Sequence, residues 1–250
     1  ECGGSGPDQH FTCSGFKPET KDALQAAVDL WVSSPESTEA TYGHISDWDV
    51  SLITDMSYLF QNKTTFNDNI GDWDVSSVTG MWNMFQNAHS FNQDISSWDI
   101  SSATDISGMF ADAHSFNQDI SSWNVSSITE IQNMFEDAHS FNQDISIWDV
   151  SSVREIQNMF RNAHSFNQDI SSWDVSSVLD FQEMFRNANS LSDENKCAIH
   201  TSFSSNENWS SDNSGYDWSE NQDCNGECFG DAVVDDCGVC DGGNASMDDC

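Results

Sequence analysis

Basic side chains are scarce in this chain of 250 residues. Seven Lys and Arg stand against 42 Asp and Glu, which gives a formal net charge of −35. Proteins that bind nucleic acid neutralise phosphates with Lys and Arg, so this composition argues against DNA or RNA as a partner. Cations are the partners that a surface of this charge favours.

Long apolar runs are also missing. No window approaches the 18 apolar residues of a membrane-spanning helix, so no membrane span is predicted. The chain begins at Glu1 without a methionine or an apolar signal-like stretch, and we expect a mature form or a piece of a longer protein. Ten Trp and 16 Phe distinguish it from disordered acidic chains, which lack the aromatics that offset ordering entropy. The composition therefore predicts a folded acidic protein.

The cysteines lie near the two ends of the sequence, which is typical of a protein from an oxidising compartment. Four Cys in the tail have spacings that also permit zinc, but the same context favours disulfides. Eight cysteines allow 105 pairings, so no pairing is predicted. The disulfide candidates are Cys2, Cys13, Cys197, Cys224, Cys228, Cys237, Cys240 and Cys250. Four glycosylation sequons, at Asn62, Asn124, Asn208 and Asn244, indicate the same compartment. We predict a secreted, extracellular or cell-surface protein that carries covalent glycans.

A repeat of 25 residues dominates the middle of the chain. Six units follow one another without an insertion from Ile45 to about Glu194. Such a period predicts a solenoid, in which each unit completes the core of its neighbour. The predicted core consists of Trp48, Trp73, Trp98, Trp123, Trp148 and Trp173, of Phe60, Phe85, Phe110, Phe135, Phe160 and Phe185, and of a second column at Phe66, Phe91, Phe116, Phe141, Phe166 and Leu191.

Two periodicities within one unit predict a strand and a helix. Ile145, Trp148 and Val150 match the L-x-x-L-x-L spacing of a leucine-rich-repeat strand. Over 151–163 the apolar residues lie three or four apart, which predicts a helix of about three turns. In the return segment, Asn167 and Asp169 are expected to bond turn amides. The predicted fold class is an α/β solenoid, a leucine-rich-repeat-like right-handed coil of short parallel strands and short helices, with helical caps and a small disulfide-rich tail.

The flanks of the repeats predict caps, because a terminal unit would otherwise expose its apolar side. Leu24, Ala27, Val28 and Trp31 form one helical stripe before the first unit. We divide the chain into a Cys-containing segment (1–17), an N-terminal capping helix (18–44), six repeats (45–194), a C-terminal cap with a Ser/Asn-rich linker (195–222) and a Cys-rich acidic module (223–250).

The motif "MF..AHSFNQDIS.WDVSSV" resembles the 25-residue repeat of the BspA-like leucine-rich-repeat surface proteins, over residues 45–194. This resemblance implies an extracellular or cell-surface protein, often one part of a larger chain, with a role in attachment or assembly and without catalytic residues to transfer. The tail at 223–250 is similar to the acidic spacer repeats of large secreted eukaryotic proteins, which are disulfide-bonded and sometimes bind calcium. It lacks a regular D-x-D-x-D-G run, which argues against calcium there.

An outward column of acidic residues on the predicted sheet is the candidate partner or cation face. Two carboxylates about 5 Å apart repel by roughly 0.8 kcal/mol in water and by about 3 kcal/mol at an effective dielectric of 20, so the column needs water or a neutralising partner. We interpret it as a solvated acidic face, with a calcium-bridged ladder or the binding site of a basic partner as alternatives. Its members are Asp49, Asp74, Asp99, Asp149 and Asp174, and Asn124 interrupts it.

Other columns offer less. His89, His114, His139 and His164 could seat zinc, but a surface turn repeated four times explains the same pattern, so no metal is assigned. No phosphate loop, nucleophile elbow or metal-binding helix motif occurs. A regular solenoid also lacks the convergent pocket of most active sites. We expect no enzyme and no cofactor other than a structural calcium.

Two functions follow from these expectations. The first is a secreted structural subunit or module of an extracellular glycoprotein assembly, such as a filament, flagellar hair or surface coat, formed by self-association or by contacts with other surface proteins. The alternative is a cell-surface adhesion or recognition module that binds a protein or a glycan through the open sheet face, with calcium as a possible requirement.

Overall fold

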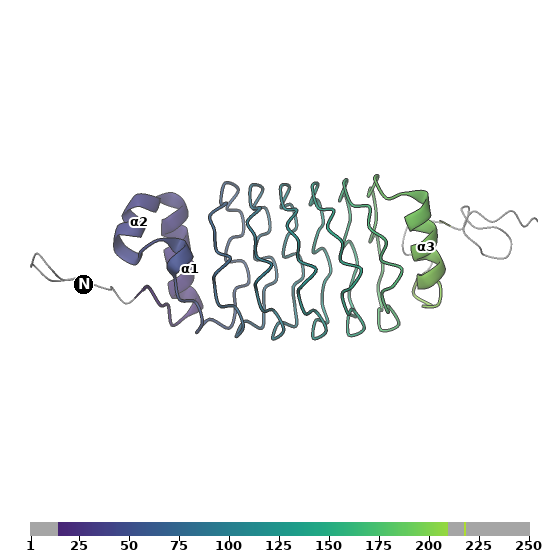
Figure 1. The fold of residues 1–250 in the computed structure, drawn as a ribbon, viewed down its shortest axis with the longest axis horizontal. Helices are drawn as coiled ribbons and strands as arrows, with labels where there is room; N and C mark the ends of the chain where they lie inside the picture. Colours follow the sequence, from purple (N-terminus) through teal and green to yellow (C-terminus); the bar gives the residue numbers. More distant parts are fainter. Residues whose placement is uncertain (1–14, 210–217, 219–250) are drawn as a thin grey trace, which may run out of the picture.

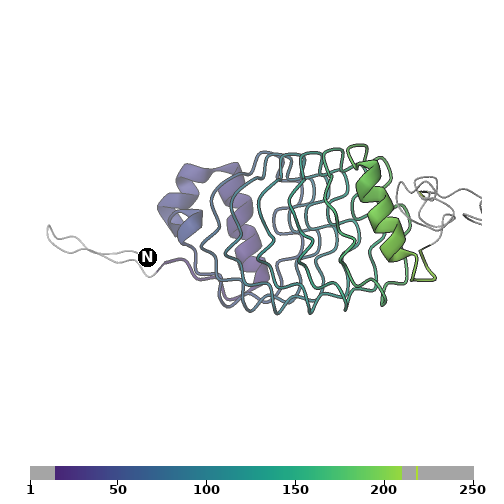
Figure 2. The same ribbon diagram turned by 45° about the vertical axis from the view of Figure 1, so that its right-hand side comes forward.

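The computed structural model describes residues 15–209 and 218. Helices α1 (Lys21–Ser33) and α2 (Pro35–Tyr42) and the 3-10 turn η1 (Ile45–Asp47) come first, and helix α3 (Asp193–Phe203) follows the repeats. Figures 1 and 2 show the coils of the repeat stacked side by side, with α1 and α2 at one end and α3 at the other. The described part of the chain is therefore an elongated stack of coils with helices at both ends.

The predicted α/β class is wrong. In the repeats as the structure describes them, neither the strand expected near residues 145–150 nor the helix expected over 151–163 is formed. Pairing between coils in strand geometry is limited to isolated parallel bridges, which join Asp55, Gly80, Asp105, Glu130, Glu155 and Asp180 in turn. The repeats thus consist of turns and irregular segments, not of the strands and helices of a leucine-rich-repeat-like coil.

Positive φ angles explain why no helix forms. Each coil has two such residues four positions apart, for example Asn133 (φ 58°) and Asp137 (φ 55°), and a right-handed helix excludes this conformation. Most of these positions carry Asn, Asp or Gly, the residues that adopt it most readily. Around them the chain makes short turns, in which Met134, Glu136 and Ala138 donate their N–H to the carbonyl three residues earlier. The apolar spacing of three or four residues arises from these turns.

The same segment bonds each coil to the next. The N–H groups of Ile131, Asn133, Phe135 and Asp137 donate to the carbonyls of residues 155, 157, 159 and 161, at N–O distances of 2.8–3.1 Å. These bonds use every second peptide, and the peptides between them close the turns within the coil. Buried backbone groups must find such partners, so this wall of the stack is satisfied without regular secondary structure.

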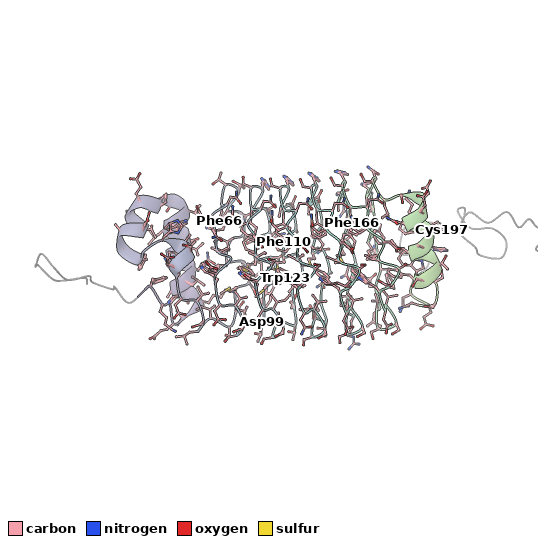
Figure 3. The ribbon with its side chains drawn as sticks, in the orientation of Figure 1. Phe66, Asp99, Phe110, Trp123, Phe166 and Cys197 are labelled. Atoms are coloured by element: carbon pink, nitrogen blue, oxygen red, sulfur yellow. The ribbon has the colours of Figure 1, made fainter. Side chains whose placement is uncertain are left out.

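Stacked aromatic rings fill the interior. Phe110 lies 5.6 Å from Phe85 and 5.9 Å from Phe135 between ring centroids, with interplanar angles of 3° and 6°, and it contacts Phe116 of its own coil at 3.8 Å. The six repeat Trp and both Phe columns are buried, as is Leu191. Figure 3 shows Phe110 and Trp123 inside the stack and Asp99 at its edge. Each ring is thus packed by the coils before and after it.

Polar side chains also connect the coils. The Nε1–H of Trp123 donates to the Ile95 carbonyl at 3.1 Å, and the equivalent bond recurs at Trp73, Trp98, Trp148 and Trp173. Asn117 Oδ1 accepts the N–H of Asn142 and the Nε2–H of Gln143, each at 2.9 Å. Asn167 acts in the same way on Ser192, so it bonds the next coil instead of its own turn. These bonds satisfy groups that the irregular backbone would leave unpaired.

The helices cover the ends of the stack. Leu24, Ala27, Val28 and Trp31 of α1 are buried, and Trp31 meets Trp48 edge-to-face at 6.0 Å. Within 18–44 the structure has two helices instead of one, because Pro35 begins α2 after Ser34 has ended α1. At the other end Cys197, Ile199 and Phe203 of α3 are buried. Among the described residues, no helix is long and apolar enough to cross a membrane.

Candidate acidic recognition face

The predicted acidic column forms corners of the coils. Asp149 Oδ1 accepts the N–H of Ser151 at 3.1 Å and its hydroxyl at 2.6 Å. The other members bond the N–H of the Ser two residues later in the same way, and Asn124 makes both bonds to Ser126. Such Asx turns need only one side-chain oxygen, which explains why Asn can replace Asp. The second oxygen, Oδ2, takes no part in the turn.

A second acidic column runs beside the first, five residues earlier in each coil. Its Oδ1 atoms accept the N–H two residues later at 2.9 Å, for example from Ser146 to Asp144 and from Ser171 to Asp169. The sequence analysis did not include this column in the candidate site, although its Asp-x-Ser spacing has the same period. The column consists of Asp94, Asp119, Asp144 and Asp169, with Asn69 in an earlier coil. We call the two columns together the acidic face.

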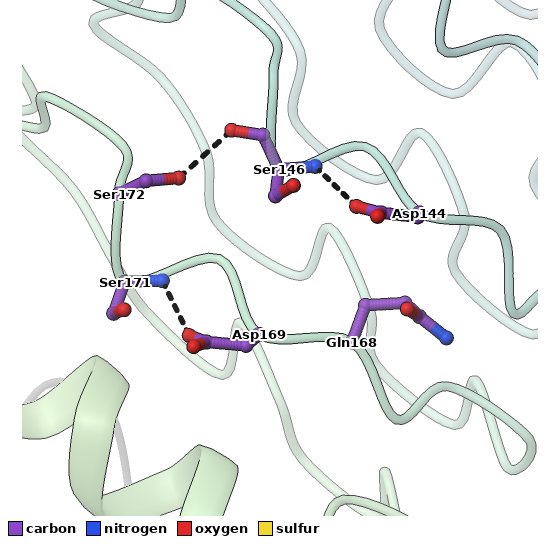
Figure 4. Close-up of a pocket in the computed structure, with 6 residues that line it drawn as sticks. All are labelled: Asp144, Ser146, Gln168, Asp169, Ser171 and Ser172. Atoms are coloured by element: carbon purple, nitrogen blue, oxygen red, sulfur yellow. Dashed lines mark hydrogen bonds between the residues drawn. The ribbon is translucent and has the colours of Figure 1, made fainter.

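A cavity of about 320 Å³ opens on this face between two neighbouring coils. It is lined by Asp144, Ser146, Gln168, Asp169, Ser171 and Ser172. Figure 4 shows the two Asp-to-Ser turns lying in parallel, with the Ser172 hydroxyl donating to the Ser146 carbonyl at 2.8 Å across the coils. The lining combines two carboxylates with three hydroxyls and an amide, so it can accept hydrogen bonds from a cationic or hydroxyl-bearing group.

Hydrogen bonds keep the face ionised. The Lys17 and Ser51 side chains lower the pKa of Asp49 to about 2. Hydrogen bonds from the Ser two residues later lower the pKa of Asp99, Asp149 and Asp174 in the first column and of Asp94, Asp119 and Asp144 in the second. Neighbouring carboxylates oppose this effect, since Asp144 and Asp94 act to raise the pKa of Asp119. The Asx turns therefore offset the repulsion that the sequence analysis expected water or a partner to relieve.

Protein cations scarcely reach the acidic face. In the region that the structure describes, its one ion pair joins Lys17 Nζ to Asp49 Oδ2 at 2.7 Å. Over the same residues, no group of three or more His, Cys, Asp or Glu side chains has an arrangement that could hold a metal ion. Each Oδ1 is already engaged in its turn, which reduces the ligands that a cation could recruit from neighbouring coils.

The His column forms a stack of parallel rings. Centroids of His89, His114, His139 and His164 lie 4.4, 4.5 and 4.8 Å apart. Parallel rings direct their nitrogen lone pairs side by side instead of toward one point, which does not suit zinc. Burial, and then the charges of His139 and His89, lower the pKa of His114, although Asp112 and Asp137 act against this. The column is a row of interacting imidazoles at the edge of the stack.

The other predicted residues occupy different environments. Asn62 and Asn124 are exposed, whereas Asn208 donates its Nδ2–H, the atom that a glycan would modify, to the Val178 carbonyl at 3.1 Å. Cys197 is buried and disulfide-bonded. Asn244 and the candidates Cys2, Cys13, Cys224, Cys228, Cys237, Cys240 and Cys250 lie outside the described residues.

Comparison with known families places the repeats. Residues 32–145 and 119–214 match the family described as "Mycoplasma protein of unknown function, DUF285". No curated protein and no solved structure matches the chain. The match covers the N-terminal end of the coil stack, all six repeats and helix α3, which is well over half of the sequence. It does not by itself assign the chain to the BspA-like leucine-rich-repeat proteins. The chain belongs to the DUF285 family.

Proposed function

We propose that this protein is a non-catalytic recognition module of the cell surface, which binds a basic protein through its acidic face. The observation that carries the proposal is the pair of carboxylate columns, in which every Asp is fixed by its turn and keeps Oδ2 outside that turn. The resemblance to BspA-like surface proteins supports an extracellular location. Complementary charge would give such an interface fast association and a strong dependence on salt.

The rigidity of the face supports binding over disorder-driven contacts. Each carboxylate stands on a corner that is bonded within its own coil and packed on a buried Trp, as Asp149 is on Trp148. Preorganised groups lose little conformational entropy on binding, so a regular row of them suits an extended basic segment. Repetition along the stack adds further contacts of the same kind without a new type of site.

A structural subunit of an extracellular assembly has less support. Helices α1 and α2 cover one end of the coil stack and α3 covers the other, so neighbouring copies could not simply continue the coils head to tail. An assembly would have to use the long faces. Such contacts would also require copies of the same acidic chain to overcome their mutual repulsion.

A charge-removal series tests the recognition function. Asp99→Asn, Asp149→Asn and Asp174→Asn combined should keep the turns, because Asn124 makes the same bonds. The matched control removes as many charges from exposed cap residues through Glu19→Gln, Glu36→Gln and Glu39→Gln. Calorimetric titration with a short Lys-rich peptide at several salt concentrations should show weaker binding for the first variant only. Equal binding by both variants, or no binding by the unmodified chain at low salt, would overturn the proposal.

A further inference from the structure

Ile147 departs from the repeat at an exposed position. Its side chain is 74 % exposed, more than any other large apolar side chain in the described residues. The equivalent residues Ser97, Ser122 and Ser172 donate their hydroxyls to carbonyls of the preceding coil, at 2.8–2.9 Å. Isoleucine has no donor, so the Ser121 carbonyl does not receive this bond. One coil has therefore lost a contact between coils and gained an apolar group in water.

This residue lies beside the cavity of the acidic face. Its chain neighbour Ser146 lines the cavity, and so does Ser172, the residue at the same position of the next coil. Asp144 and Asp169 line the same cavity. An exposed apolar side chain, two carboxylates and several hydroxyls thus border one depression, and the other coils have Ser or Asp where this coil has Ile147.

The charges at this cavity lack a counterion within the protein. In the described part of the chain, no ion pair includes Asp144 or Asp169. Hydrogen bonds from Ser146 lower the pKa of Asp144, so this carboxylate is charged at neutral pH. A ligand of complementary charge would therefore be basic. A Lys or Arg side chain fits well, because its apolar stem can cover a neighbouring apolar group while its charged end meets the carboxylates.

We propose that the cavity at Asp144, Asp169 and Ile147 is the specificity site of the acidic face. It takes a protein segment that places a Lys or Arg side chain against Asp144 and Asp169 and an apolar side chain against Ile147. This inference rests on the proposed function and narrows it, since the columns supply attraction along the whole stack whereas this cavity selects the sequence bound. Burial of the apolar contact should improve affinity by about tenfold.

Two peptide probes of equal charge test the site. One contains Lys-Leu-Lys and the other Lys-Ser-Lys, each between the same Gly and Ser residues. The full chain should bind the Leu peptide about tenfold more tightly than the Ser peptide. Ile147→Ser should abolish this preference and leave binding of the Ser peptide unchanged. Its unfolding midpoint in urea should equal or exceed that of the unmodified chain, because Ser restores the donor to the Ser121 carbonyl.

Two further variants locate the effect. Asp144→Asn with Asp169→Asn keeps the Asx turns and should weaken both peptides, as removal of the charged partners requires. Ser122→Ile creates a second exposed Ile away from this cavity and should leave the Leu preference of the chain unchanged. If Ile147→Ser retains the preference while both peptides still bind, the inference is wrong and the proposed function stands. If neither peptide binds the unmodified chain at low salt, the proposed function itself fails.

Discussion

The interior and the outer corners of the coils obey different rules. Phe110 contacts rings of the coil before, the coil after and its own coil, so its shape is determined from several sides. Asp149, in contrast, bonds only the Ser two residues later. Substitutions inside should therefore affect three coils at once, whereas a corner requires only an acceptor for its turn. This difference explains why Asn124 and Ile147, the departures discussed above, lie outside.

The largest effect should come from removing an interior ring. Phe110→Ala leaves a cavity between stacked rings and should lower the free energy of unfolding by about 3–5 kcal/mol. Urea denaturation followed by Trp fluorescence measures it. Phe110→Leu, which retains most of the volume, should cost clearly less. A loss below about 1 kcal/mol for the Ala variant would mean that the coils do not share one interior.

A smaller loss is expected from the Asn column, which connects coils without filling the interior. Asn117→Ala removes the acceptor of the Asn142 N–H and the Gln143 Nε2–H and should cost about 1–3 kcal/mol. Asn117→Asp keeps the acceptor and serves as the control. Hydrogen exchange should show faster exchange of the Asn142 amide in the Ala variant alone. Unchanged exchange would show that this bond does not protect the coil junction.

The outer corners should tolerate change if an acceptor remains. Asp74→Ala removes the acceptor of the Ser76 N–H and hydroxyl, and should cost about 1 kcal/mol. Asp74→Asn should be nearly neutral, because Asn124 makes the same bonds in another coil. Thermal unfolding of the two variants side by side measures the difference. Equal losses for both would imply that charge, not the turn, matters at the corner.

Acid should act on the corners before it acts on the interior. The folded pKa of Asp49 is about 2 against an ordinary 3.8, so its contribution to stability is complete above pH 3.8 and is lost as the pH falls toward 2. Asp49→Asn should flatten the dependence of the unfolding midpoint on pH in that window. An unchanged slope would contradict the role of the bonds from Lys17 and Ser51.

The His column should give a small effect near neutral pH. The folded pKa of His114 lies below 6.5, so the fold favours the neutral ring, and this contribution is complete above pH 6.5 and declines as the pH falls through that value. His114→Asn, which places there the residue found at the equivalent Asn189, should reduce the decline. Nuclear magnetic resonance titration of the His ring protons measures the pKa directly. A value at or above 6.5 for His114 would contradict this account.

The sequence was a better guide to which residues face inward than to local backbone conformation. Trp123 and Phe110 recur at a fixed period, and the structure buries both. The helix expected over 151–163 was wrong because Asn158 and Asn162 adopt positive φ. Apolar spacing alone cannot distinguish a helix from consecutive short turns, since both return an inward side chain every three or four residues. The regular Asn pair was the available signal.

The candidate site was predicted in part for a related reason. The first acidic column was found from its period, but Asp149 was interpreted through charge and spacing alone, without its turn to Ser151. Asp144 and Asp169 were not assigned to the site, because only the stacking of two coils places their turns around one cavity. Ile147 was passed over because a single changed letter has no meaning until its exposure is known.

The sequence by itself determined the period of the stack, the rings that share its interior and the excess of negative charge, because apolar spacing and composition are properties of the chain alone. The tertiary structure decided how each coil is made and what lies side by side on its surface. The physical reason is that each coil obtains many of its hydrogen bonds from the next coil, so neither its turns nor its acidic face is complete until the coils are stacked.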